Sequence, residues 1–263
     1  MAPGKQAKKL IFNPAPLHFS AICREVFPDA DISLAIFPLD SLKPKDSSIL
    51  SIWLHQKEQL QLEQFSLEKR SREWLGGRIC AKQSARMFFQ RRKNQTIIPN
   101  YSQCRIQSDA DGRPSFQQLE GLDIDFPELS ISHSKKIAAA MSSLPCCGID
   151  IQFAAATLER VQEKFCSSKE EQTLKKLVPN LPRISRLTLL WSAKEAAKKM
   201  LSPEGIPGFQ ELTLLHNSRS DNGVALFSFA KTGSQFPIQT VATMFRPDYA
   251  LAICCRQNTE GID

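Results

Sequence analysis

Asp150 stands between Ile149 and Ile151 in a segment predicted to be a strand, Cys146–Gln152. A carboxylate among apolar neighbours in a central strand needs a partner, such as a metal ion, an arginine or backbone donors. Mg²⁺ would suit it, because this ion binds one or two carboxylates together with phosphate oxygens and water. Taken alone, the pattern favours an aspartate that caps a turn at the end of the strand.

A second segment gathers groups that could bind a phosphate at the end of another predicted strand. It holds hydroxyl, imidazole and ammonium groups in sequence: Ser132, His133, Ser134, Lys135 and Lys136. Together these groups would make a reasonable phosphate cradle. A lone histidine, however, more often packs in the interior or lies in a solvated loop.

A third segment, residues 187–200, predicts a helix with a narrow polar stripe at 100° per residue. Four polar residues share the stripe: Thr188, Ser192, Glu195 and Lys199. Glu195 and Lys199 thus form an i,i+4 pair. Most pairs of this kind are ordinary surface ion pairs worth a few tenths of a kcal/mol, so the helix alone does not decide its role.

Composition limits the class of partner. The 263 residues carry a net charge of +7 and a pI near 9.0, which favours an anionic partner. The basic residues occur in short clusters and not in one long run interleaved with aromatic residues, which weakens a nucleic-acid interpretation. A chain of this length with 42% hydrophobic residues can build one large core or two modest ones.

Cysteine usage and hydropathy indicate the compartment. None of the eight cysteines has C-x-x-C spacing, which favours reduced thiols packed as small apolar groups over a zinc site or a disulfide framework. The apolar stretch Leu10–Phe12 is too short for a secretory signal. No window reaches the ~18 apolar residues of a membrane span. We expect a soluble cytoplasmic protein.

The elements that must position these groups can be placed coarsely. Residues Met1–Pro16 are predicted to be a flexible basic lead, Ile32–Leu39 a strand, and Ser48–Gln90 mostly helical. Gly76 and Gly77 are unfavourable inside a helix, by about 1 kcal/mol each. A close approach of another backbone is the usual compensation.

The pattern then repeats in style. Leu129–Met141 and Cys147–Ile151 are predicted strands that flank a turn at Ser142 and Ser143, which is the candidate domain boundary. The predicted elements beyond it are helices at Ala155–Leu177 and Pro182–Leu201 and strands at Glu211–Leu215, Val224–Phe229 and Ala242–Cys254. Two α+β halves of similar size result.

The order of the segments points to a known family. G-I-D at 148–150, followed by W-S-A-K-E-A-A-K-K at 191–199, resembles the two signature motifs of 4'-phosphopantetheinyl transferases of the surfactin/enterobactin-synthetase type. Weaker matches to the same family occur in the correct order: R-E-W-L-G-G-R-I-C-A-K-Q-S-A at 72–85, G-R-P at 112–114, S-I-S-H-S at 130–134 and F-C-S-S-K-E at 165–170. The resemblance spans about Arg70 to Lys199.

The resemblance implies an α+β fold built as a pseudo-dimer of two similar halves, with the active site in the cleft between them. Residues 1–143 would form the side that binds the 3'-phosphate of coenzyme A. Residues 144–263 would carry the magnesium site and the catalytic helix. One chain would supply both sides of the cleft, so the protein is expected to be a monomer.

The resemblance also implies a reaction. The enzyme would move the phosphopantetheine arm of coenzyme A to a serine of an apo acyl or peptidyl carrier protein and release 3',5'-ADP. Asp150 and Glu195 would hold Mg²⁺, Glu195 would deprotonate the serine, and Lys199 would stabilise the leaving phosphate. By the same resemblance, the coenzyme A contacts would be Arg78, Arg113, Ser132, His133 and Lys199, with Lys194 in a supporting role.

One position departs from the family pattern. Gln152 stands where many relatives carry a second acidic ligand, so it would bring an amide oxygen to the metal and the site would hold Mg²⁺ weakly before coenzyme A arrives. Glu170 and Glu171 compete for one family position. The alternatives are a degenerate homologue that binds coenzyme A or a carrier without transfer and, far behind, a nucleic-acid-binding protein. No membrane partner is expected.

Overall fold

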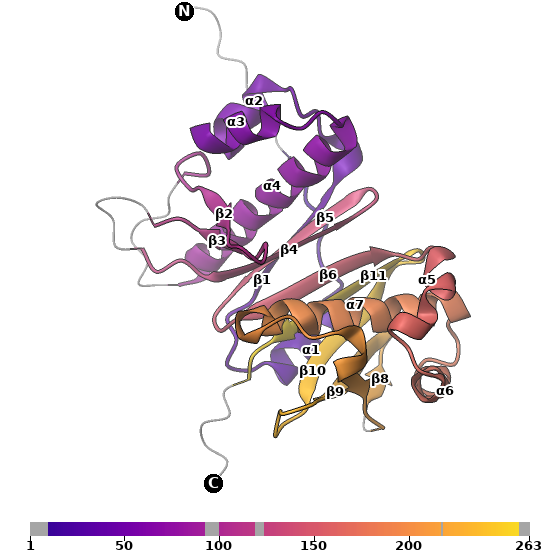
Figure 1. Cartoon of the computed structure of the whole chain (residues 1–263). Helices are drawn as coiled ribbons and strands as arrows, with labels where there is room; N and C mark the ends of the chain where they lie inside the picture. The colour runs from indigo at the N-terminus through magenta and orange to yellow at the C-terminus, as the bar shows by residue number, and fades with distance from the viewer. Residues whose placement is uncertain (1–9, 93–99, 119–123, 217, 258–263) are drawn as a thin grey trace, which may run out of the picture.

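The chain folds into two bodies that meet along one seam (Figure 1). This computed structural model describes residues 10–92, 100–118, 124–216 and 218–257. Within these ranges, every pair of named strands is antiparallel, and runs of helices are followed by runs of strands along the chain. The fold is therefore of the mixed α+β class.

The first part of the chain builds a small sheet covered by a long helix. Its elements are α1 (Leu17–Val26), β1 (Ser33–Pro38), α2 (Ser47–Trp53), α3 (Gln56–Glu63), α4 (Glu68–Arg91), β2 (Ile106–Ser108), β3 (Pro114–Phe116), β4 (Glu128–Ser134) and β5 (Ile137–Ser143). The sheet has the order β1-β5-β4, while β2 and β3 form a separate ribbon. Helix α4 packs on the sheet, and Leu75, Ile79 and Ala138 belong to the shared core.

The second part builds a larger sheet around another long helix. Its elements are β6 (Cys147–Phe153), α5 (Thr157–Arg160), α6 (Ser168–Leu177), α7 (Arg183–Leu201), β7 (Leu212–Leu214), β8 (Arg219–Asp221), β9 (Val224–Lys231), β10 (Ile238–Arg246) and β11 (Tyr249–Cys255). The sheet has the order β6-β11-β10-β9-β7, with β8 beside β9. Helix α7 covers one face, where Leu190 and Ala193 pack on Phe227.

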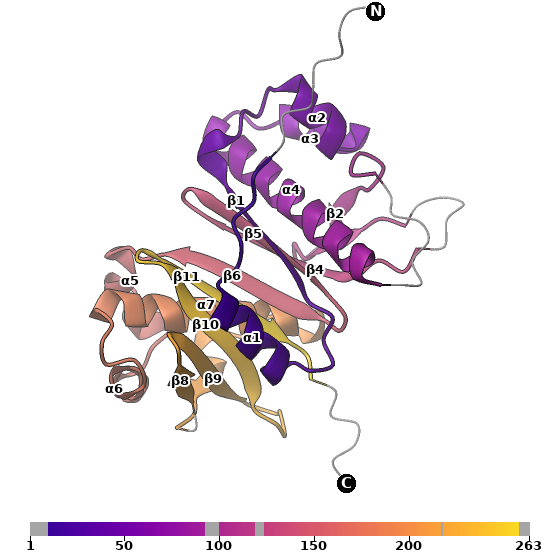
Figure 2. The same ribbon diagram turned by 180° about the vertical axis from the view of Figure 1, so that it is seen from behind.

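Helix α1 crosses to the second part of the chain. Its buried residues Phe19 and Cys23 join a core with Val241 and Ile253, on the face of the larger sheet opposite to α7. Figure 2 shows α1 lying against β10. The sequence offered no sign of this crossing, because a short amphipathic helix does not specify which apolar face it will cover.

The two parts follow the same order of elements. The first part contains, in this order, strand β1, helices α3 and α4, and the hairpin β4–β5. The second part contains the corresponding strand β6, helices α6 and α7, and the hairpin β10–β11. In each part the first strand pairs with the last, which pairs with the strand before it. The sheets nevertheless differ in size, because the second carries the additional strands β7, β8 and β9.

Several predicted elements are confirmed. The strand expected over Ile32–Leu39 is β1, the helical region Ser48–Gln90 contains α2 to α4, and the helix expected over Pro182–Leu201 is α7. The helical glycines do meet close neighbours, but these are side chains and not the backbone that was expected. A Cβ added to Gly76 would lie 2.2 Å from Leu39 Cδ2.

Other predicted boundaries are wrong. Each of the strands expected over Leu129–Met141 and Ala242–Cys254 is two strands of a hairpin, and the helix expected over Ala155–Leu177 is interrupted between α5 and α6. The first hairpin turns at Lys135, whose φ is 49°. A lysine rarely adopts this left-handed conformation, so the turn left no glycine or asparagine signal in the sequence.

The predicted flexible lead also needs correction. Its first nine residues lie outside the described part of the chain, but the Asn13 amide donates to the Ile36 carbonyl at 2.8 Å, so the lead is anchored to β1. The turn expected at Ser142 and Ser143 falls after them, since both lie in β5. In the described residues, no helix is both long and apolar enough to cross a bilayer.

Candidate active site

Helix α7 lies directly against β6 at Gly148. A Cβ built on this glycine would fall 1.9 Å from the Ala196 carbonyl oxygen and 2.8 Å from the Met200 nitrogen. Only a residue without a side chain therefore allows the two backbones to approach so closely. Because side chains alternate along a strand, Asp150 and Gln152 lie on the same face of β6 as Gly148, toward α7.

The Asp150 carboxylate is buried, and its two oxygens differ in their contacts. Oδ1 accepts hydrogen bonds from Ser132 Oγ at 2.8 Å and from Lys199 Nζ at 2.9 Å. Lys199 Nζ also donates to the Ile149 carbonyl at 2.9 Å. Oδ2 is buried without any hydrogen-bond partner. A buried carboxylate oxygen in this state is a candidate metal ligand, since an unpaired polar atom is otherwise costly.

Glu195 lies one helical turn before Lys199 and lines a cavity of about 250 Å³ with it. Its carboxylate pairs with Lys198 Nζ at 3.2 Å and is partly exposed. The Gln152 side-chain amide donates to the Phe153 carbonyl at 3.2 Å, so its oxygen remains an available acceptor. In the described ranges, no three His, Cys, Asp or Glu side chains form a metal-binding group.

The two bodies meet where the edge strands β4 and β6 lie side by side. Hydroxyl groups of alternate β4 residues accept hydrogen bonds from alternate β6 amides. The three bonds run from Ile149 N to Ser130 Oγ at 3.0 Å, from Ile151 N to Ser132 Oγ at 3.2 Å and from Phe153 N to Ser134 Oγ at 3.0 Å. We call these three bonds the serine ladder. Asp150 sits in its middle.

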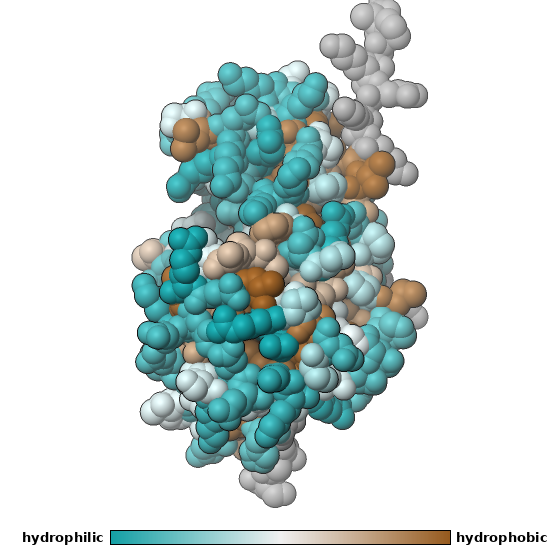
Figure 3. Space-filling model, turned by 90° about the vertical axis from the view of Figure 1, so that its right-hand side faces the viewer, coloured by the Kyte–Doolittle hydropathy of each residue, from teal (hydrophilic) through white to brown (hydrophobic). Residues whose placement is uncertain are grey.

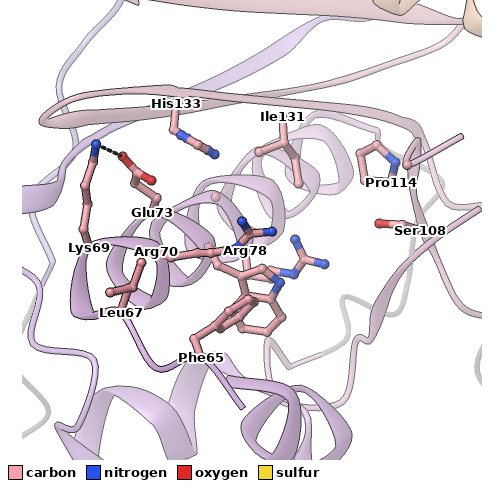
Figure 4. A pocket seen from close by; sticks show the side chains of 13 residues that line it. Phe65, Leu67, Lys69, Arg70, Glu73, Arg78, Ser108, Pro114, Ile131 and His133 are labelled. Carbon is pink, nitrogen blue, oxygen red and sulfur yellow. Dashed lines mark ion pairs between the residues drawn. The ribbon is translucent and has the colours of Figure 1, made fainter. Parts of the chain in front are cut away.

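A basic cavity of about 540 Å³ opens on the other face of β4, between β4 and α4 (Figure 4). Its basic side chains are Lys69, Arg70, Arg78 and His133. The Arg78 guanidinium stacks on the Trp74 ring at 4.2 Å, and its Nε is buried without a partner. Burial lowers the pKa of Arg78. An anion would satisfy both the charge and the free donor.

His133 faces this cavity, whereas its neighbour Ser132 faces the seam, because consecutive strand residues point to opposite faces. Desolvation beside α4 lowers the pKa of His133 below 6.5, although Glu73 opposes this effect. The imidazole is therefore mostly neutral at pH 7. The family resemblance implies that Ser132 and His133 contact one phosphate, but alternation along the strand turns their side chains to opposite faces.

The two cavities adjoin. Gly112, Pro114 and Ile131 line both, and Glu195 and Lys199 stand on the far side of this boundary from Arg78. An elongated ligand could thus extend from the basic cavity, past Pro114 and Ile131, to the carboxylates at the seam. The turn at residues 109–114 closes the boundary, with Gly112 at a φ of 81°.

Arg113 joins this turn to the end of α7. Its Nη1 donates to Ser202 Oγ at 2.9 Å and to the Lys199 carbonyl at 3.2 Å, and its Nη2 donates to Glu128 Oε2 at 2.5 Å. The hydrogen bond to Glu128 raises the pKa of Arg113 although burial opposes it. Arg113 borders the smaller cavity, but these donors already serve the protein.

The structure does not bring Lys194 to the cleft. Its ammonium is buried and donates to Glu170 Oε1 at 2.7 Å and to the Phe165 carbonyl at 2.7 Å. Burial alone would raise the pKa of Glu170, but the bonds from Lys194 lower it overall. Lys194 lies about 100° around the helix from Glu195, more than a quarter of a turn, so it meets the core instead of the seam. Glu171 is the surface residue of the acidic pair and binds Arg183.

The same buried arrangement occurs in the first part of the chain. Lys82 Nζ of α4 binds Glu58 of α3 and donates to the Trp53 carbonyl at 2.8 Å. In both pairs the lysine follows the glutamate by 24 residues and the residue whose carbonyl accepts its hydrogen bond by 29. This shared spacing was available in the sequence and was missed there, as were Lys69 and Arg70 of the basic cavity.

Comparison with known proteins bears on the second part of the chain. Residues 146–254 match the model of the 4'-phosphopantetheinyl transferase superfamily, described as ACPS. The match covers less than half of the chain but contains Asp150, Gln152, Glu195 and Lys199. No curated protein matches the sequence.

Two solved structures are similar to part of the chain. The chain is similar to a holo-(acyl-carrier-protein) synthase from Bacillus anthracis str. Ames in complex with CoA (3',5'-ADP), with 22% identity over 43% of this chain and 92% of that chain and a TM-score of 0.34. It is also similar to holo-ACP-synthase from Plasmodium yoelii, with 18% identity over 43% of this chain and 91% of that chain and a TM-score of 0.36.

Proposed function

We propose that the protein is a 4'-phosphopantetheinyl transferase that acts on coenzyme A and an apo carrier protein. The observation that carries this proposal is the Asp150 carboxylate, which is held by Lys199 at the seam with one buried oxygen unpartnered. The family match over residues 146–254 supports the same reaction. Assignment to the surfactin/enterobactin-synthetase type rests on the motifs in the sequence.

The residues at the seam fit Mg²⁺. Asp150 and Glu195 would hold the ion, with Gln152 as a neutral third ligand and phosphate oxygens and water completing the shell. When bound, Mg²⁺ would neutralise the negative charge that accumulates on the pyrophosphate. The unpartnered Oδ2 of Asp150 is the feature of this chain that such an ion would satisfy.

Coenzyme A would occupy the two adjoining cavities. The 3'-phosphate would lie in the basic cavity, where Arg78 and His133 offer donors, and the pyrophosphate would lie at the boundary near Lys199. The free Nε of Arg78 supports this placement. Ser132 would not contact the phosphate, because its hydroxyl already donates to Asp150.

The transfer would proceed by direct displacement. Glu195 would take the proton of the carrier serine, and the serine oxygen would form a bond to the β-phosphorus. The bond between that phosphorus and the bridging oxygen would break, and 3',5'-ADP would leave with the electron pair. Lys199 would stabilise the charge that develops on the leaving phosphate.

We propose that the two halves, residues 1–143 and 144–263, form a pseudo-dimer within one chain. The protein would then act as a monomer. An offset of 112 residues maps β5 (Ile137–Ser143) onto β11 (Tyr249–Cys255) and the Lys82–Glu58 pair onto the Lys194–Glu170 pair. A shared strand order supports this relation as well. The seam would then be the interface between the two repeats.

The carrier protein would approach the open end of the smaller cavity, where Ile206 is 54% exposed beside Lys198. A net charge of +7 suits an acidic partner. Figure 3 shows that the face on the right of Figure 1 is mainly hydrophilic, with hydrophobic residues gathered in the middle of the lower body.

Incubation with coenzyme A, Mg²⁺ and a panel of apo carrier proteins tests the proposal by mass spectrometry. Wild-type protein should add one phosphopantetheine group per carrier, and Glu195→Gln should lose this activity. Glu25→Gln, which removes an exposed carboxylate on α1, is the control. Binding of coenzyme A without formation of 3',5'-ADP would instead support a non-catalytic homologue. The reason to consider this alternative is Gln152, which is neutral.

A further inference from the structure

The three bonds of the serine ladder are not equivalent. Each of Ser130, Ser132 and Ser134 accepts a hydrogen bond from a β6 amide, and the three serines are spaced two residues apart along β4. Only Ser132 also donates to a side chain on β6, namely to Asp150 Oδ1 at 2.8 Å. Ser132 is buried, with 6% of its surface exposed.

The direction of this hydrogen bond is fixed by the backbone. A serine hydroxyl has one proton to donate and two lone pairs that accept. The Ile151 amide can only donate, so it occupies a lone pair of Ser132 Oγ. The hydroxyl proton is then free for the carboxylate, which can only accept when ionised. The ladder therefore orients Ser132 toward Asp150 before any ligand binds.

We infer that Ser132 is a positioning residue that holds Asp150 for its role in binding the metal. Ser132 and Lys199 both occupy Oδ1, one from each side of the seam, and this leaves Oδ2 as the oxygen without a partner. The inference deepens the proposed function and rests on it for the identity of the ion. It differs from a phosphate contact, which would require Ser132 to face the basic cavity.

The three serines provide matched variants. Ser130→Ala, Ser132→Ala and Ser134→Ala each remove one ladder acceptor, so each should lower the thermal midpoint. Ser132→Ala should lower it most, because it also removes the hydrogen bond to Asp150. Only Ser132→Ala should raise the Mg²⁺ concentration needed for half-maximal transfer, by about tenfold or more, as is common for groups that orient a metal ligand. The affinity for coenzyme A measured by calorimetry without Mg²⁺ should not change. Ser132→Thr keeps the hydroxyl, so the Mg²⁺ concentration that it needs for half-maximal transfer should equal that of the wild-type protein.

Two results would overturn the inference. One is an equal shift in Mg²⁺ requirement for all three alanine variants, which would make the effect a general loosening of the seam. The other is an unchanged Mg²⁺ requirement for Ser132→Ala with a loss of coenzyme A affinity, which would make Ser132 a phosphate contact.

A double-mutant cycle separates the failure of this inference from the failure of the proposed function. Ser132→Ala and Asp150→Asn should have non-additive effects on the thermal midpoint of the metal-free protein, whereas Ser134→Ala and Asp150→Asn should be additive. This readout needs neither Mg²⁺ nor transfer activity. If the wild-type protein shows no transfer activity and the cycle still shows coupling, the proposed reaction is wrong but the contact is confirmed. Additive effects for Ser132 and Asp150 would refute the positioning role even in an active enzyme.

Discussion

The Lys199 ammonium lies 2.9 Å from Oδ1 of Asp150, and the other oxygen of that carboxylate is buried and unpartnered. Two elements far apart in the sequence create this relationship. Lys199 comes from the last turns of α7 and Asp150 from the edge strand β6. The packing of α7 on β6 therefore controls the state of the carboxylate.

Replacement of Lys199 by methionine should lower the rate of transfer by a factor on the order of 10² to 10³, because the leaving phosphate would lose its cation. A mass-spectrometric time course with saturating coenzyme A would measure the effect. Lys175→Met on the exposed face of α6 removes the same charge and is the control. If both variants slow the transfer equally, net charge and not the position of Lys199 is responsible.

Substitution of Gly148 by alanine should push α7 away from β6, since the new Cβ would overlap the Ala196 carbonyl. We expect a loss of about 1–3 kcal/mol in the free energy of unfolding, or more, as for other overpacked sites. Urea titration would measure this loss. The control is Gly77→Ala, whose Cβ would meet only the Ile131 side chain, at 3.0 Å. Because that side chain can turn, this variant should be less affected, and equal losses would contradict the explanation.

Replacement of Lys194 by methionine should destabilise the protein by about 3–5 kcal/mol, because Glu170 would be left as a buried carboxylate without its cation. The second variant, Lys194→Met with Glu170→Gln, should recover part of this stability. Urea unfolding of both variants gives the values. Lys82→Met should behave like Lys194→Met, since its pair with Glu58 is equally buried. A fully stable Lys194→Met variant that failed to bind coenzyme A would restore Lys194 as a ligand.

The affinity for coenzyme A should rise as the pH falls, provided that His133 contacts the 3'-phosphate. Desolvation lowers the pKa of His133 in the free protein, and a bound phosphate would raise it because it favours the imidazolium. The gain in affinity is complete below the pKa that His133 has in the free protein. It is lost as the pH rises through the pKa that His133 has in the complex. Calorimetry in two buffers should detect proton uptake for wild-type protein and less for His133→Asn.

The same shift has the opposite consequence for stability. The pKa of His133 is lower in the folded protein than in the unfolded chain, so the unfolded state binds more protons between the two pKa values. The contribution of His133 to stability is therefore complete above pH 6.5 and is lost as the pH falls. Unfolding of His133→Asn should depend less on pH in this range, and an identical dependence would contradict the shift.

Asp150, Glu195, Lys199 and His133 were candidates from their types and spacing, but their expected roles came from the resemblance to the family. Helix α7 and strand β1 were predicted from local sequence patterns. These features are local: a helix is specified by its own repeating apolar face, and a strand by its branched and aromatic residues. The cavities could not be predicted in the same way, because their walls come from α4, β4 and α7 together.

Tertiary structure alone decided the roles of neighbouring residues. Along β4, Ser132 turned to the seam and His133 to the basic cavity; along α7, Lys194 turned to the core and Glu195 to the cleft. The sequence by itself determined which chemical groups the protein has and the local elements that carry them. It did not determine which face each group meets, because that depends on how α7 packs on β6 and how the edges of two sheets come together. These contacts join residues distant in the chain, and their free energy is set by packing across the whole fold.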